Sequence, residues 1–143
     1  MPDDDNILHF PHIERIEIEH VDALSKALNL LGCYRLIGHT PVRLESPIEW
    51  ANAMAERFSL KRQHGVDPWR VDETFLRDVH VSTVFLGLNH NFRGADPPVL
   101  FETMVFGGKH DNYQERCSTW DEAEAMHAEA VELVRRGHLR VVK

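Results

Sequence analysis

Two oppositely charged residues, Glu102 and Arg116, have the types and spacing that most directly suggest chemistry. Glu102 stands between Leu100 and Met104 in an apolar segment, where strand alternation would place all three side chains on one face. An unpaired carboxylate there would be costly and would tend to become protonated. Arg116, expected on the next strand, is a natural partner, and its planar guanidinium could also hold an anionic group. The pair is therefore either part of a ligand pocket or a structural ion pair within the sheet.

A second candidate is the segment Asn89-His90-Asn91-Phe92, which follows an apolar run and leads into a glycine. Asparagine and histidine offer donors and acceptors, and Phe92 could stack on a planar ring. Loops on a rigid sheet are common recognition sites. The alternative is a turn whose asparagine side chains bond their own backbone. The set suits an anionic, ring-bearing small molecule such as a nucleotide-derived signal. The predicted ligand-binding residues are Asn89, His90, Asn91, Phe92, Glu102 and Arg116.

The ten histidines do not fall into a catalytic or metal-binding pattern. The run beginning at His80 matches half of a two-histidine phosphoesterase motif, and no second half is present at a suitable distance. A triad of Ser82, His90 and Asp96 lacks a nucleophile-elbow sequence. Metal-ligand spacings such as Cys-x-x-Cys are absent. His127, on an apolar helix stripe, is interpreted as a hydrogen-bonded core histidine. We therefore predict no catalytic residues, no metal and no cofactor.

The composition is that of one folded domain. The chain has 143 residues, of which 43% are hydrophobic and 8% aromatic, which excludes disorder for most of its length. A net charge of −7 argues against general nucleic-acid binding. No apolar run is long enough for a membrane span, and the acidic start is unlike a signal peptide. With only Cys33 and Cys117, reduced thiols in a cytoplasm are expected.

The first part of the chain, residues 1–33, is predicted to be an arm and a helix. The spacing of apolar residues favours a helix over about 20–31 after a short strand or extended arm. A continuous helix from Ile13 is the alternative. Gly32 could cap the helix in either case. The α+β domain is then expected over 34–143.

That domain is predicted to be an antiparallel β-sheet meander packed against a C-terminal α-helix. Ser46 and Glu49 form a capping box at the start of an earlier helix. Gly137 is expected to end the last helix, with an edge strand over 138–142. The fold class is thus α+β, a single domain with an N-terminal helical extension. The expected elements are a strand over 34–44 that is interrupted by Gly38 and Pro41, a helix from Pro47, strands over 70–74, 79–88, 98–106 and 113–117, and a helix over 119–136.

Two of these strands, 81–88 and 98–106, are apolar on both faces. A sheet with two apolar faces needs two covers. One cover is the 119–136 helix, and the other is the helix from Pro47 or a partner subunit. We therefore expect a homo-oligomer.

Three segments carry a resemblance to known proteins: VSTVFLGLNHNF (81–92), PPVLFETMVFGG (97–108) and RCSTWDEAEAMHAEAV (116–131). They resemble a family of small, mostly uncharacterised phage- and prophage-encoded proteins, over roughly residues 34–135. In that family an Asp often replaces Asn89, a Tyr replaces Cys117 and a Gly replaces Met126. If the family's Asp serves metal or proton chemistry, Asn89 could not do the same.

The resemblance implies a phage-side role in the cytoplasm of an infected or lysogenic bacterium, but no particular reaction. Because no nucleophile, base or metal set stands at an interpretable spacing, we expect a non-enzymatic, counter-defence binding protein that sequesters a small anionic signal molecule or blocks a bacterial host protein. Two alternatives stay open, namely a nucleotide-directed hydrolase and a virion or assembly component.

Overall fold

In the computed structural model, residues 32–91 and 96–139 are described, and they form two antiparallel sheets and two helices. The α+β fold class is therefore confirmed. The predicted helix over 20–31 and Phe92 lie outside the described residues. The elements in chain order are β1 (Cys33–Ile37), β2 (Thr40–Leu44), α2 (Pro47–His64), β3 (Arg70–Leu76), β4 (Val79–Phe85), β5 (Phe101–Phe106), β6 (Gln114–Cys117) and α3 (Trp120–Leu139).

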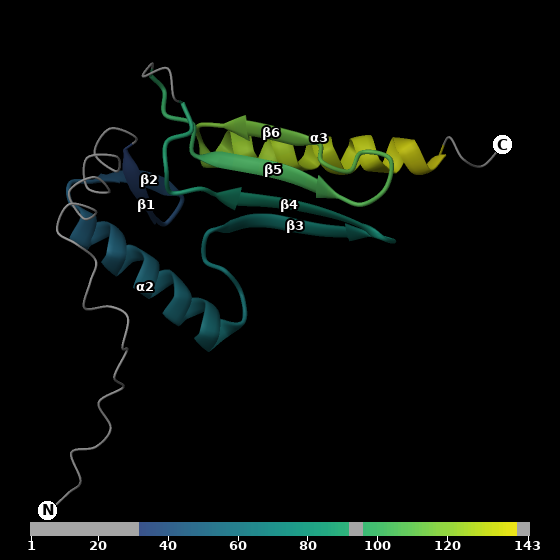
Figure 1. The fold of residues 1–143 in the computed structure, drawn as a ribbon. Helices are drawn as coiled ribbons and strands as arrows, with labels where there is room; N and C mark the ends of the chain where they lie inside the picture. The colour runs from purple at the N-terminus through teal and green to yellow at the C-terminus, as the bar shows by residue number, and fades with distance from the viewer. Residues whose placement is uncertain (1–31, 92–95, 140–143) are drawn as a thin grey trace, which may run out of the picture.

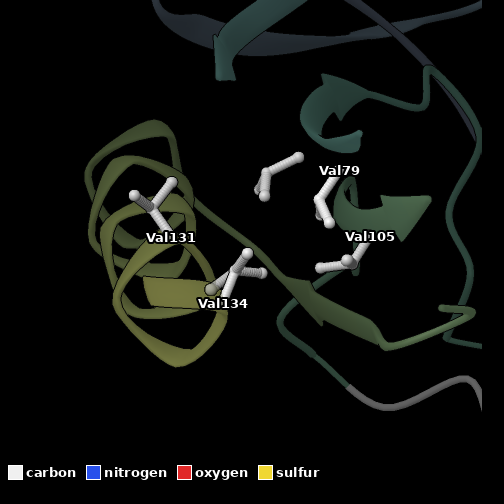
Figure 2. Close-up of a cluster of buried hydrophobic side chains, with 6 residues drawn as sticks. Val79, Val105, Val131 and Val134 are labelled. Atoms are coloured by element: carbon white, nitrogen blue, oxygen red, sulfur yellow. The ribbon is translucent and has the colours of Figure 1, made fainter. Parts of the chain in front are cut away.

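The larger sheet has the strand order β3-β4-β5-β6, and each neighbouring pair is antiparallel. The meander and its C-terminal helix are thus confirmed, because α3 runs along one face of all four strands (Figure 1). Valine side chains fill the space between the helix and the strands (Figure 2). The buried residues of this first core are Val79, Val81, Val105, Ala130, Val131 and Val134.

A second core joins α2 and the β1–β2 hairpin to one end of this sheet (Figure 1). Tyr34 from the hairpin and Trp50 from α2 pack against it. The ring of His39, at the hairpin turn, stacks on Trp120 at the start of α3, with centroids 3.9 Å apart. The hairpin, α2 and the sheet therefore share packed contacts. The buried residues of this core are Trp69, Phe85, Leu100, Phe101 and Ala123.

The segment predicted as one interrupted strand over 34–44 is instead the β1–β2 hairpin, a separate two-stranded sheet. Gly38 has φ +61, so the glycine that was read as an interruption makes the turn that reverses the chain. The helix start at Ser46 is confirmed, because its hydroxyl accepts from Glu49 N at 3.3 Å. Gly65, with φ +71, ends α2 by donating to Lys61 O.

Several boundaries differ from the prediction. The strand expected over 79–88 ends at Phe85, shortly before Gly87, whose φ of +75 takes the chain out of extended geometry. The strand expected over 98–106 begins at Phe101, and the one expected over 70–74 continues to Leu76. The last helix does not end at Gly137 but continues to Leu139, so the first residues of the expected edge strand are helical. Only the left-handed φ typical of a glycine cap would have stopped the helix, and Gly137 does not adopt it.

The second face of the larger sheet is not covered by α2, whose main contacts are with β1 and β2. That part of the two-cover prediction is wrong, because the connection from α2 places it beside the sheet rather than across it (Figure 1). No described helix packs on this second face, which we call the open face. By strand register it carries Arg70, Glu73, Phe75, His80, Ser82, Val84, Glu102, Met104, Phe106, Gln114 and Arg116.

Candidate functional site

The predicted pairing of Glu102 and Arg116 is confirmed on the open face. The two residues lie directly opposite each other on β5 and β6. Arg116 Nε donates to Glu102 Oε2 at 2.8 Å, and Gln114 Nε2 donates to the same oxygen at 2.5 Å. Glu102 is 13% exposed and Arg116 is 36% exposed. The carboxylate is therefore held within the sheet, whereas the guanidinium reaches solvent.

The contact with Glu102 uses only the Nε edge of the Arg116 guanidinium. Its two terminal nitrogens, Nη1 and Nη2, hydrogen-bond to none of the described residues. These two atoms form the planar fork that binds a carboxylate or phosphate with two parallel hydrogen bonds. Glu102 thus orients Arg116, and no described residue hydrogen-bonds to the anion-binding edge of its guanidinium.

Arg116 and Glu102 belong to a row of four residues that crosses the open face, which we call the cross-strand row: Arg70, Val84, Glu102 and Arg116. At its other end, Arg70 forms an ion pair with Glu73. The Arg70 Nε atom is buried and finds no acceptor among the described residues. A buried donor without an acceptor is uncommon in native proteins. The row therefore has a cation at each end, with the apolar Val84 and the paired Glu102 carboxylate between them.

The predicted loop residues serve the local backbone. Asn89 Oδ1 accepts from Asn91 N at 2.8 Å and from Val99 N at 2.9 Å. His90 Nδ1 lies 2.8 Å from Leu88 O. These hydrogen bonds hold the chain between β4 and β5 and do not reach Glu102 or Arg116. The turn interpretation of the two asparagines accounts for the bonds, and a ligand-binding role for the loop stays a prediction.

Sequence reasoning missed a buried polar network beneath α3. His127 is 3% exposed, and its Nδ1 and Nε2 atoms lie 2.7 Å and 2.8 Å from the hydroxyls of Thr83 and Thr74. Thr83 in turn shares a 2.6 Å hydrogen bond with Thr103. The interpretation of His127 as a hydrogen-bonded core residue is confirmed. Thr83 and Thr103 lie among the apolar residues that face the helix, but threonine is common in strands, so the sequence carried no signal that marked them.

Burial lowers the pKa of His127, an effect that the Asp72 carboxylate opposes and His80 reinforces. Asp72 Oδ2 is 3.7 Å from His127 Nε2 and lies at the edge of the network. The histidine is therefore favoured in its neutral form, with both ring nitrogens engaged by hydroxyl groups. Such a ring is poorly placed to exchange protons with a bound substrate.

The two cysteine thiols are also poor nucleophiles near neutral pH. Cys33 and Cys117 both remain thiols. Burial raises the pKa of Cys117 to about 11, and the carboxylate of Glu122 adds to the rise. Burial also raises the pKa of Cys33. Neither side chain carries appreciable thiolate, the nucleophilic form, near neutral pH.

The remaining candidates from the sequence are held apart from one another. His80 hydrogen-bonds Glu73 at 2.8 Å and stacks on Phe75, with ring centroids 4.4 Å apart. Ser82 is buried on the open face of β4, whereas the His90 ring is engaged with Leu88 O. The proposed Ser82–His90–Asp96 triad therefore has no support in these contacts.

A small cavity of about 220 Å³ lies between the hairpin and α2, lined in part by Arg35, Leu36 and Trp69. The neighbouring Arg57 donates twice to Asp67 and lies 4.5 Å above the Trp69 ring. Burial would raise the pKa of Asp67, but the hydrogen bonds from Arg57 and Trp69 N bring it below its usual value. This ion pair ties the middle of α2 to the connection that leads into β3.

Within residues 32–91 and 96–139, no group of three or more histidine, cysteine or acidic side chains is arranged to hold a metal ion. In the same part of the chain, neither helix combines the length and apolar character that crossing a bilayer requires. Comparison with protein-family models, with curated proteins and with solved structures finds no match to this chain.

Proposed function

We propose that this chain is a non-enzymatic binding protein that holds a small anionic ligand on its open face, with Arg116 as the anion-binding group. The observation that carries the proposal is the orientation of Arg116 by Glu102. The carboxylate contacts Nε at 2.8 Å, Nη1 and Nη2 hydrogen-bond to none of the described residues, and the Arg116 side chain is 36% exposed. A guanidinium oriented in this way loses less conformational entropy when it binds an anion.

The cross-strand row suggests the class of ligand. Neighbouring strands are about 4.8 Å apart, so the backbones of Arg70 and Arg116, three strands apart, are separated by roughly 14 Å. Val84 offers an apolar surface between them. A ring-bearing molecule with anionic groups, such as a nucleotide-derived signal, matches this spacing. A second anionic group of the ligand would lie near Arg70, whose Nε finds no acceptor among the described residues.

The state of the nucleophiles and bases favours binding without turnover. His127 is buried, and both of its ring nitrogens are engaged. The thiol of Cys117 stays protonated at neutral pH. General bases and nucleophiles need a pKa near the working pH and access to the substrate. We therefore propose that the ligand leaves the protein unchanged.

The resemblance to phage- and prophage-encoded proteins gives this activity a biological setting. We propose that the chain acts in the cytoplasm of the bacterial host and sequesters a signal molecule, as a counter-defence protein would. Blocking a bacterial host protein is the second candidate, and it is favoured by aromatic side chains exposed on the same face, Phe75 and Phe106.

The experiment is a titration of purified full-length protein with cyclic and ADP-ribose-type nucleotides, followed by thermal shift and calorimetry. We expect at least one nucleotide to raise the melting temperature, and Arg116→Gln to weaken its binding by about tenfold or more, equivalent to about 1.4 kcal/mol. Arg136→Gln is the matched control, because Arg136 is also paired with a glutamate but lies on α3. Circular dichroism confirms that both variants fold.

Mass analysis of the nucleotide recovered after heat denaturation separates the alternatives. An unchanged nucleotide supports sequestration, and a converted one supports the hydrolase alternative. Equal affinity of the wild type and Arg116→Gln would contradict the assignment of Arg116. If no nucleotide shifts the melting temperature, the host-protein alternative becomes the better explanation.

A further inference from the structure

Three aromatic side chains lie in line across the open face, and we call them the aromatic row: Phe75, His80 and Phe106. They occupy directly opposed positions on β3, β4 and β5. The His80 ring stacks on both neighbours, with centroids 4.4 Å from Phe75 and 5.6 Å from Phe106. Phe75 is 67% exposed and Phe106 is 44% exposed. The row is therefore a continuous aromatic surface that faces solvent in the described structure.

The aromatic row is fixed in place before any partner arrives. His80 Nε2 hydrogen-bonds Glu73 Oε1 at 2.8 Å, and Glu73 is itself paired with Arg70. Strand pairing on both sides of β4 holds the three backbones in register. These side chains therefore lose little conformational entropy when a partner binds, and this favours a specific contact at the aromatic row.

The charges of the open face indicate what kind of surface fits it. Its two arginines and two glutamates form separate pairs, Arg70 with Glu73 and Arg116 with Glu102, so their formal charges cancel. The whole chain carries −7, which opposes self-association at long range, so two copies would have to meet through a locally neutral surface. A second neutral aromatic face could approach this one without local charge repulsion. The open face of another copy of this chain has that character.

We propose that two copies of this chain associate through the aromatic row in a two-fold symmetric, face-to-face contact. Two-fold contacts bring the same patch of both subunits together, so a flat row of rings is matched by its own copy. Sheets that pack face to face lie about 10 Å apart, a spacing that interdigitated aromatic side chains can fill. This contact would cover the end of the open face that carries the aromatic row, and the cross-strand row, four residues away along β4 and β5, would stay accessible to a ligand.

Other exposed apolar residues lack these properties. Ile48 and Phe58 lie on α2, and Val66 follows it. None of them belongs to a row of stacked rings among the contacts of the described residues. Scattered exposed apolar side chains are normal on protein surfaces. Phe58 therefore serves as a matched control, since it is 52% exposed and equally large.

The test is light scattering coupled to size exclusion, on ligand-free, full-length protein from low to high micromolar concentration. We expect a dimer for the wild type and for Phe58→Asp. Phe75→Asp and Phe106→Asp should be monomers, or dimers at least tenfold weaker. A separate variant, Phe75→Ser, removes the ring without adding charge and should weaken the dimer in the same direction. Circular dichroism and melting temperature establish that each variant is folded.

A monomeric wild type would overturn the proposal, and so would Phe75 variants that dimerise as well as the wild type. In the second case the row is covered by something else, such as the chain's own residues 1–31. Because these measurements use no ligand, they are independent of the proposed function. Arg116→Gln should remain a dimer, so loss of ligand binding and loss of association can be told apart.

Discussion

The hydrogen bonds around His127 favour the neutral form of its imidazole ring, which is buried between α3 and the larger sheet. A neutral imidazole has one donor nitrogen and one acceptor nitrogen, so the hydroxyls of Thr74 and Thr83 must take opposite roles. The hydrogen bond between the Thr83 and Thr103 hydroxyls adds one more group to this network. A second proton would remove the ring's one acceptor, and the hydroxyl that donates to that nitrogen would lose its bond or have to turn around. Only Asp72, 3.7 Å away, would offset the new charge.

We predict that the free energy of unfolding falls as the pH is lowered from about 8 to 5. Burial holds the pKa of His127 in the folded protein below its ordinary value of 6.5, with Asp72 opposing and His80 reinforcing the effect. Below pH 6.5 the unfolded chain binds a proton that the folded chain does not. This stability is therefore fully present above that pH and is lost as the pH falls toward the folded pKa. Urea unfolding at a series of pH values measures it.

The variant His127→Gln should flatten this pH dependence and cost about 1–3 kcal/mol near pH 8, because it disrupts the bonds to Thr83 and Thr74. His64→Gln, at the exposed end of α2, should keep the slope of the wild type. Asp67 does not interfere, since its pKa lies below 3.8 and its contribution is lost only at more acidic pH. Parallel slopes for the wild type and His127→Gln would contradict the assignment.

At the level of single residues, the sequence allowed the ion pair to be predicted but not the threonine network. Glu102 was recognisable because a carboxylate in an apolar strand must find a partner. Thr83 gave no such signal, because threonine is common in strands whether or not its hydroxyl has a buried role. The outward direction of Arg116 also depends on the register of β5 and β6, which residue types alone do not specify.

At the level of elements, glycines accounted for most of the errors in the predicted boundaries. Gly38 was read as an interruption of one strand, yet it turns the chain between two strands. Gly137 was read as the end of α3, yet the helix continues through it. A glycine in a sequence can mark a turn, a cap or a close contact, and the surrounding structure decides which.

Two glycine substitutions should therefore change stability in opposite directions. Gly137→Ala should raise the free energy of unfolding by about 0.4–1 kcal/mol, because Gly137 is helical and an added Cβ would meet the His110 ring at an ordinary 3.5 Å. Gly87→Ala should lower it by about 2 kcal/mol or more, since Gly87 has φ +75 and its Cβ would lie 2.5 Å from the buried Trp69 ring. Urea denaturation compares the free energy of unfolding of both variants with that of the wild type. A lower value for Gly137→Ala would contradict the placement of Gly137 within α3.

For the whole molecule, the alternating strands and the amphipathic C-terminal helix were enough to predict the meander and its cover. The position of α2 was not predictable, because its apolar face is weak and its main contacts lie with the hairpin. The second core depends on residues far apart in sequence, such as Tyr34 and Trp120. Contacts of that kind follow from the path of the chain and are not encoded in local periodicity.

The two cores predict that the molecule unfolds in one step although α2 and the hairpin lie at one end of the sheet. All three tryptophans, Trp50, Trp69 and Trp120, pack in the second core, so their fluorescence reports that end. Far-ultraviolet circular dichroism reports the helices and strands of the whole chain. Because Phe85 and Phe101 continue the strands that carry the first core, the two cores should lose their structure together.

The discriminating variant is Val134→Ala, which opens space in the first core, in the cluster that contains no tryptophan. We expect it to cost about 1–3 kcal/mol. In a single cooperative unit, this loss must move the fluorescence midpoint and the circular dichroism midpoint by the same amount of urea, and the two midpoints must also coincide in the wild type. If fluorescence changes first in the wild type, or stays unmoved by Val134→Ala, then α2 and the hairpin fold as a unit separate from the sheet and α3. Their stacking contact between His39 and Trp120 would then be too weak to couple them.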